Sequence, residues 1–241
     1  MSIADKLTQI AENEQKVYDA GYAAGQAAGG GGYDEGYADG KQAEYDRFWD
    51  TYGGNGSYAY AGRAWTDEVF KPNKDIVVSS AANMFIDSGI QKLKQILQDQ
   101  DVVLDVSNST SNYNFARSSR ITHFPFIDFR NCSDLNNAWN GCTQMVELSL
   151  AIKEKAKCSA PFTNCPMLTD LTIVSGTFGT SVSFAQSPLL SDASIQSIID
   201  HLADLTGGTA QTLTFHTDVL LRLTDEQIAT ILAKNWTLVF A

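Results

Sequence analysis

Two stretches of this chain repeat one pattern of residue types. Residues 139–150 read WNGCTQMVELSL and residues 162–173 read FTNCPMLTDLTI, so an aromatic residue, a cysteine and three aliphatic positions coincide at an offset of 23 residues. A third copy starts at Phe115, which lies 24 residues before Trp139. Periods between about 20 and 29 residues are typical of leucine-rich repeats. The repeat therefore restricts the chain to folds that stack similar units.

The three copies share columns of apolar or small residues. Aligned on Phe115, Trp139 and Phe162, the columns are Ser118/Cys142/Cys165, Ile121/Met145/Leu168, Phe124/Leu148/Leu171 and Phe126/Leu150/Ile173. The last two columns predict a short strand with inward apolar residues, because side chains alternate across a strand. A single unit cannot bury its apolar face alone, whereas stacked units share one core. The sequence predicts an α/β fold, a short leucine-rich-repeat solenoid with a period of about 23 residues, over residues 80–241.

The outward positions of these strands are the candidate binding residues. They alternate with the inward aliphatic residues of the second and third copies, and they are Glu147, Ser149, Asp170 and Thr172. We expect these side chains to form a face that binds a partner.

The end of the chain departs from the 23-residue period. Ser191 is a favourable helix cap, and an aliphatic stripe follows it from Ile195 to Leu205. Residues 224–227 read TDEQ, which predicts a capping box at the start of a second helix. We interpret these two helix–strand units as an atypical C-terminal cap, because the terminal units of a solenoid must shield its core from water.

Residues 1–50 read as a helical, Gly-rich leader. The stretches YDAGYAAGQAA (18–28) and YDEGYADGKQA (33–43) repeat with a period of 15 residues. Two interpretations remain open: a glycine face that allows close helix–helix approach, or a flexible spacer. Either way the leader lacks the apolar content for its own core, so we expect self-association or docking. The predicted oligomerisation residues are Ile3, Leu7, Ile10, Val17, Gly21, Gly25, Gly36 and Gly40.

Residues 51–79 are rich in Gly, Asn and Pro, and we interpret them as an irregular connector that caps the solenoid. Aromatic residues cluster at 45–65. They either cover the open N-terminal end of the solenoid or stand exposed to bind a sugar or a protein. Both interpretations remain open.

Charge and composition exclude several classes of function. The formal net charge of −11 repels phosphate backbones, so nucleic-acid binding is not expected. The first residues lack the basic and apolar regions of a secretion signal, and no apolar run is long enough to predict a membrane span. None of the four cysteines forms a C-x-x-C pair, and Cys142 and Cys165 read as small buried residues.

Catalytic signals are weak. The common hydrolase, metalloprotease and nucleotide-binding motifs are missing, so we expect no enzyme activity, no cofactor and no metal. Asp200, His201 and Asp204 form a possible metal or acid–base cluster, but their position opposite the aliphatic stripe favours a solvated helix face. A glycan hydrolase would need carboxylates that converge on the strand face, and its candidates are Asp128, Glu147 and Asp170.

NGCTQMVELSL, TNCPMLTDLTI, SFAQSPLLSDASIQSIIDHLADLTG and LTDEQIATILAKNWTLVFA resemble the BspA-like leucine-rich-repeat solenoids of phage and prophage proteins from gut Firmicutes. IADKLTQIAENEQKVYDAGYAAG and KQAEYDRFWDTY are similar to the leader that often precedes that solenoid. The resemblance implies a virion- or tail-associated protein, synthesised in the bacterial cytoplasm.

These observations together predict a non-enzymatic phage structural, receptor-binding or adhesion protein. Its expected partners are copies of itself, other phage structural proteins, or a bacterial surface protein or glycan. Two alternatives remain: a carbohydrate- or cell-wall-active enzyme with its site on the solenoid face, and a prophage-encoded factor that binds a host protein.

Overall fold

The computed structural model describes residues 60, 65–68 and 70–241. The predicted leader, with all eight predicted oligomerisation residues, lies outside the described residues. The described part is mixed α/β, with short parallel sheets and few helices, and the sheets do not close into a barrel.

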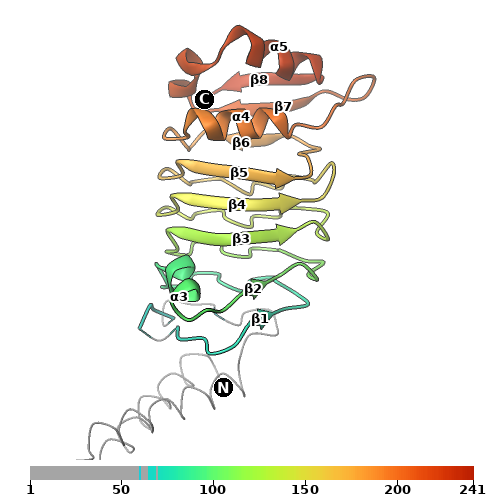
Figure 1. Ribbon diagram of the computed structural model, residues 1–241. Coiled ribbons are helices and arrows are strands. Elements are labelled where there is room, and N and C mark those ends of the chain that lie inside the picture. Colours follow the sequence, from blue (N-terminus) through green and yellow to red (C-terminus); the bar gives the residue numbers. More distant parts are fainter. Residues whose placement is uncertain (1–59, 61–64, 69) are drawn as a thin grey trace, which may run out of the picture.

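Three parallel sheets follow one another along the molecule (Figure 1). Strand β1 (Ile76–Val77) pairs with β2 (Leu104–Asp105). The second sheet has the order β3 (His123–Phe129), β4 (Glu147–Ile152) and β5 (Asp170–Ser175). The third has the order β6 (Val182–Phe184), β7 (Gln211–Phe215) and β8 (Trp236–Phe240).

Three α-helices accompany the sheets in the described part: α3 (Leu93–Asp99), α4 (Asp192–Asp200) and α5 (Asp225–Ala233). A 3₁₀ helix spans Thr217–Arg222. The predicted caps are confirmed, because Ser191 accepts a hydrogen bond from the Ser194 N–H and a capping box joins Thr224 to Gln227. Helix α4 ends at Asp200, before the predicted stripe ends. No helix of the described part is long and apolar enough to cross a membrane.

Strands β4 and β5 pair as the alignment of the copies predicts. Leu148 lies beside Leu171 and Leu150 beside Ile173, and all four side chains are buried. Ser149 lies between the two leucines of β4, Thr172 lies between the two apolar residues of β5, and both side chains face outward. We call one strand with the return segment that follows it a coil. Because equivalent residues lie side by side in this parallel pair, each apolar residue has an apolar neighbour in the next coil.

The predicted column of Phe126, Leu150 and Ile173 is wrong at its first member. Ile127 pairs with Leu150 and is buried, whereas Phe126 pairs with Ser149 and is 49% exposed. The register shifts between His123 and Phe126, where Pro125 has no N–H to donate to a neighbouring strand. One additional residue at this irregularity moves every later side chain of β3 to the opposite face.

The return segments contain a second ladder of backbone hydrogen bonds. The N–H of Ala116 donates to the carbonyl of Ala138 (2.7 Å), and the N–H of Trp139 donates to that of Pro161 (3.1 Å). Pairs of residues with positive φ, four positions apart, flank these bonds in successive segments: Asn114 and Ser118, Asn137 and Gly141, Ala160 and Asn164. Ala116 is therefore the structural equivalent of Trp139, and the alignment on Phe115 is one residue out of register.

The same shift corrects the column of small residues. Ser119 is buried and lies 3.6 Å from the sulfur of Cys142, whereas the predicted Ser118 is half-buried. The thiols of Cys142 and Cys165 donate to the carbonyls of Ala116 (3.0 Å) and Trp139 (3.2 Å). The predicted burial of Cys142 and Cys165 is confirmed, and none of the four cysteines forms a disulfide.

Aromatic rings run through the core along the stack. Trp139 stacks on Phe162 with ring centroids 5.6 Å apart, and Phe162 stacks on Phe184 at 4.9 Å. At the N-terminal end, Tyr60 and Trp65 are buried, and Tyr60 stacks on Phe85 at 5.3 Å. These two described members of the predicted aromatic cluster therefore lie against the core.

Candidate functional site

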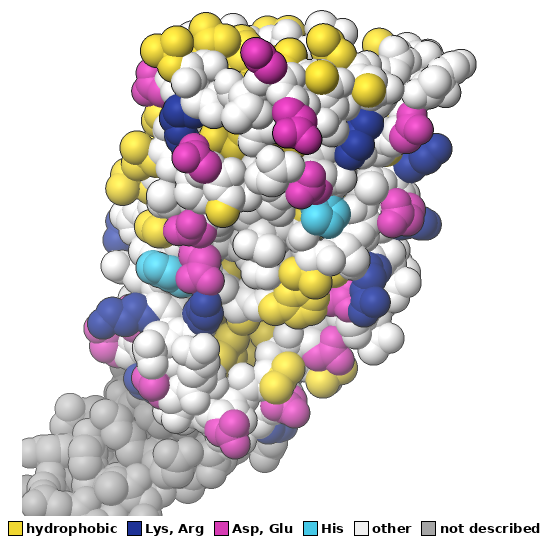
Figure 2. All heavy atoms as spheres, turned by 45° about the horizontal axis from the view of Figure 1, so that its top comes forward, with side chains coloured by type: hydrophobic (Ala, Val, Ile, Leu, Met, Phe, Trp, Pro, Cys, Tyr) yellow, Lys and Arg dark blue, Asp and Glu magenta, His cyan; other side chains and the backbone are white. Residues whose placement is uncertain are grey.

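The four predicted binding residues lie together on the outward face of β4 and β5. Glu147 is the register partner of Asp170, and Ser149 is that of Thr172. Asp170 and Thr172 are exposed, while Glu147 and Ser149 are half-buried. Figure 2 shows acidic and basic side chains interspersed on the visible face of the molecule.

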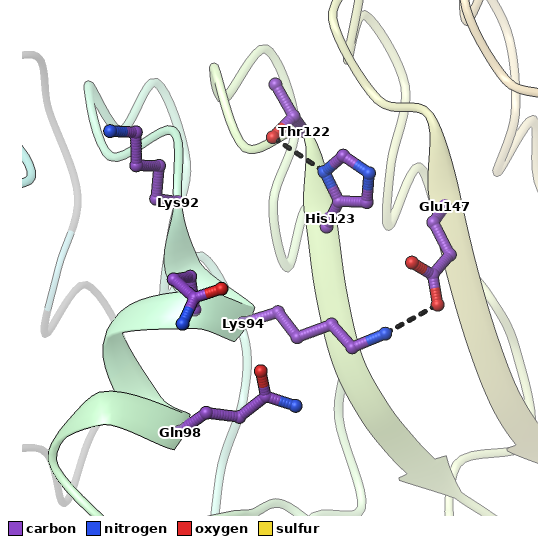
Figure 3. Close-up of a pocket in the computed structure, with 7 residues that line it drawn as sticks. Lys92, Lys94, Gln98, Thr122, His123 and Glu147 are labelled. Atoms are coloured by element: carbon purple, nitrogen blue, oxygen red, sulfur yellow. Dashed lines mark hydrogen bonds and ion pairs between the residues drawn. The ribbon is translucent and has the colours of Figure 1, made fainter.

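A shallow pocket of about 290 Å³ opens at the side of this face that adjoins α3 (Figure 3). Lys94 reaches from α3 past β3, and its Nζ lies 2.6 Å from Oε1 of Glu147 on β4. Nδ1 of His123 lies 3.0 Å from the Thr122 hydroxyl. The lining residues are Lys92, Lys94, Gln95, Gln98, Thr122, His123 and Glu147.

The pocket presents hydrogen-bonding groups of both kinds. Lysine ammonium and glutamine amide groups donate, while glutamine carbonyl and glutamate oxygens accept. A ligand with several hydroxyl or carboxylate groups suits such a lining. Among the predicted binding residues, only Glu147 lines this pocket.

Sequence reasoning missed the residues from α3. Leu93, Ile96 and Leu97 are the buried residues of this helix, and their spacing of three and four positions is a helical signal. That signal covers only two turns, and Leu93 also suits a degenerate copy of the repeat. The exposed face of the helix supplies Lys94, Gln95 and Gln98 to the pocket.

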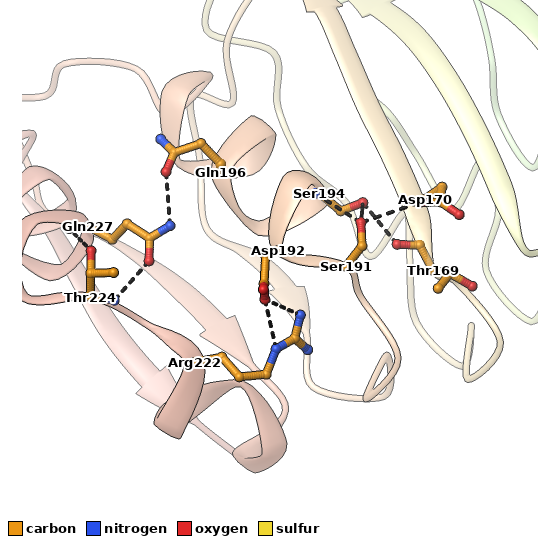
Figure 4. Close-up of polar contacts among 9 residues, drawn as sticks. All are labelled: Thr169, Asp170, Ser191, Asp192, Ser194, Gln196, Arg222, Thr224 and Gln227. Atoms are coloured by element: carbon orange, nitrogen blue, oxygen red, sulfur yellow. Dashed lines mark hydrogen bonds and ion pairs between the residues drawn. The ribbon is translucent and has the colours of Figure 1, made fainter.

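Asp170 belongs to a polar network at the other side of the face (Figure 4). Its Oδ1 accepts a hydrogen bond from the Ser191 hydroxyl at 3.3 Å. Helix α4 is joined to the last units by two further contacts: Arg222 Nε donates to Asp192 (2.9 Å), and Gln227 Nε2 donates to Gln196 (2.9 Å). The Asp170 carboxylate therefore takes part in anchoring the start of α4.

A second shallow pocket, of about 330 Å³, lies at the end of β3. Arg130 Nε lies 2.9 Å from Oδ1 of Asp128, and both residues line this pocket. The hydrogen bond from the Arg130 side chain lowers the pKa of Asp128 below its ordinary value. A carboxyl group with a lowered pKa is ionised at neutral pH, so it is a poor general acid.

The structure does not join Asp200, His201 and Asp204 into one site. Each side chain has its own partner: Gln196 Nε2 donates to Asp200 (2.7 Å), Nδ1 of His201 lies 2.8 Å from the Ser197 carbonyl, and Asp204 accepts from the Thr206 N–H (2.9 Å). Within residues 60, 65–68 and 70–241, no group of three His, Cys, Asp or Glu side chains is placed to hold a metal ion.

No protein-family model matches this chain, and neither a curated protein nor a solved structure matches it.

Proposed function

We propose that this chain is a non-enzymatic binding protein, built as a leucine-rich-repeat solenoid, whose outward strand face binds a partner. One observation carries the proposal: β3, β4 and β5 lie side by side, and polar residues from β3 and β4 meet α3 at a pocket on their outward face. A row of parallel strands offers a surface on which a large ligand can contact several coils at once.

The biological setting of the proposal rests on the resemblance to BspA-like solenoids. It suggests a phage structural, receptor-binding or adhesion protein in the virion, with a bacterial surface glycan or protein as ligand. The leader would then connect this face to copies of the chain or to other phage structural proteins.

The surroundings of the acidic residues support binding rather than hydrolysis. Lys94 pairs with Glu147, Ser191 donates to Asp170, and Arg130 pairs with Asp128. A hydrolase of glycosidic bonds needs one carboxyl group with a raised pKa that faces a second carboxylate across the substrate. The pKa of Asp128 moves in the opposite direction, below its ordinary value, because its carboxylate accepts hydrogen bonds from Arg130.

Binding of the labelled full chain to purified cell walls of Firmicutes tests the proposal. The double variant Lys94→Ala/Glu147→Ala removes the ion pair at the pocket, and we expect it to weaken binding about tenfold or more, which corresponds to about 1.4 kcal/mol. The matched control is Lys153→Ala/Glu154→Ala, which also removes one lysine and one glutamate, both exposed. We expect the control to bind as the parent does.

Equal binding by both double variants would show that the pocket is not the ligand site. Steady release of reducing sugar from the same walls by the parent protein would contradict a non-enzymatic function and support the hydrolase alternative.

A further inference from the structure

Strand β8 is the last strand of its sheet, and one of its edges faces no described strand (Figure 1). The N–H of Ala241 donates to the Phe215 carbonyl of β7 at 3.1 Å. Backbone groups of successive residues in a strand point to opposite sides. The N–H and C=O groups of Trp236, Leu238 and Phe240 therefore point away from β7, and no described residue accepts a hydrogen bond from the N–H of Leu238 or Phe240.

The corresponding edge of β5 is covered. The N–H of Leu171 donates to the Ser194 hydroxyl at 2.8 Å, and the N–H of Ile173 donates to the Ser197 hydroxyl at 2.9 Å. Helix α4 thus ends that sheet by supplying serine oxygens in place of strand carbonyls. Helix α5 packs against β8, but within the described part of the chain none of its side chains accepts a hydrogen bond from the N–H of Leu238 or Phe240.

The sequence of β8 does nothing to protect its edge. Residues 236–240 read WTLVF, with neither charge nor proline, and the β7–β8 register contains no bulge. Natural edge strands usually carry lysine, proline or a bulge, because an unprotected edge is a template for another strand.

The last units of the stack expose several apolar side chains. Leu221 is 95% exposed, and Leu220, Leu232 and Val239 are also exposed. Figure 2 shows hydrophobic side chains gathered at the C-terminal end of the stack. Residues 223–241 carry two acidic residues and one lysine, in a chain with a net charge of −11. Two such ends can approach each other with little repulsion.

We propose that β8 pairs with β8 of a second copy of the chain, antiparallel, about a two-fold axis at Leu238. In this arrangement Leu238 faces Leu238 of the partner subunit and Trp236 faces Phe240 of the partner subunit. By the same two-fold axis, Phe240 faces Trp236 of the partner subunit. Each of these three pairs exchanges two hydrogen bonds, so the interface gains about six. A two-fold contact is self-complementary, and the second copy brings the same apolar end to it. A free extended peptide could pair with the edge of β8, but it would not bring a second apolar end to the contact.

This interface is independent of the proposed binding face. It uses the end of the stack opposite β1, whereas the pocket lies beside α3 (Figure 1). Loss of cell-wall binding would leave it intact, and loss of pairing would leave the pocket intact.

Two double variants of the full chain test the pairing at the same two positions. Thr237 and Val239 are exposed, and the proposed pair places Thr237 opposite Val239 of the partner subunit. Thr237→Lys/Val239→Lys sets lysine against lysine, whereas Thr237→Lys/Val239→Glu sets lysine against glutamate. By light scattering, we expect the parent and the Lys/Glu variant to have at least twice the mass of the Lys/Lys variant.

Assembly through the leader is common to all three proteins, so it does not affect the comparison of masses. Amide hydrogen exchange supplies a second readout: we expect Leu238 and Phe240 to exchange slowly in the parent and the Lys/Glu variant and faster in the Lys/Lys variant. Equal masses of all three proteins, with equally fast exchange at these two amides, would overturn the proposal.

Discussion

The N–H of Asn164 is satisfied differently from its equivalents in the earlier return segments. The N–H of Ser118 donates to the Asn140 carbonyl, and the N–H of Gly141 donates to that of Thr163, whereas the N–H of Asn164 donates to the side chain of Gln186 at 2.7 Å. A side-chain oxygen satisfies the donor without requiring the next segment to follow the same path. The 23-residue period ends after this position.

The stability that Asp128 contributes should depend on pH. Its pKa is lowered in the folded protein, so its ion pair with Arg130 stabilises the fold above the ordinary aspartate pKa of about 3.9. That stabilisation is lost as the pH falls through the lower folded-state pKa. We expect Asp128→Asn to reduce the free energy of unfolding at neutral pH by at most about 1 kcal/mol, because solvent screens the pair.

Urea unfolding of the parent and the Asp128→Asn variant, from neutral pH into the acid range, measures this difference. We expect the two stabilities to converge as the pH falls below the aspartate range. A difference that widens toward acid pH would contradict the assignment.

Helix α4 ends one sheet and is continuous with the next unit of the stack. It packs against β5, and α3 packs against β3, so both edges of the central sheet are flanked by helices (Figure 1). Ser194 is buried, accepts from the Leu171 N–H, and donates to the Thr169 carbonyl at 2.9 Å. A serine in this position therefore joins the helix to the strand by two hydrogen bonds.

Ser194→Ala tests this junction. The substitution leaves the N–H of Leu171 and the carbonyl of Thr169 without that hydroxyl, and an unsatisfied buried polar group costs about 1–3 kcal/mol. We expect a loss of that size in the free energy of unfolding by urea. Ser183→Ala, at an exposed position of β6, is the matched control and should change it by less than about 0.5 kcal/mol. Equal effects of the two substitutions would show that α4 does not depend on Ser194.

Over the residues that the structure describes, the molecule is a stack in which each coil contacts mainly its neighbours. Strands β4 and β5 have six residues each, whereas β1 and β2 have two each. Stability in such a stack is close to a sum over neighbouring units, so short terminal sheets open more readily than central ones.

Native-state hydrogen exchange measures this gradient. We expect the amides of Ile76 and Val78, which donate to the carbonyls of Val103 and Asp105, to exchange at least about tenfold faster than those of Leu148 and Leu150. Equal rates at the two places would show instead that the stack opens as one cooperative unit.

Strands β4 and β5 and the starts of α4 and α5 follow from local sequence patterns. An inward strand position needs an apolar side chain whatever lies beside it, so Leu148, Leu150 and their equivalents are visible in the repeat. A helix cap is equally local, because Ser191 and Thr224 bind backbone groups within three residues. Such features depend on residues that are close in the chain.

The register of β3, the pocket and the unpaired edge of β8 depend on contacts between distant parts of the chain. The shift at Pro125 appears only when β3 is set beside β4. Lys94 and Glu147 are 53 positions apart, so no local pattern records their contact. Whether the amide of Leu171 or of Leu238 meets an acceptor depends on the element packed next to it, since both strands alternate alike in sequence.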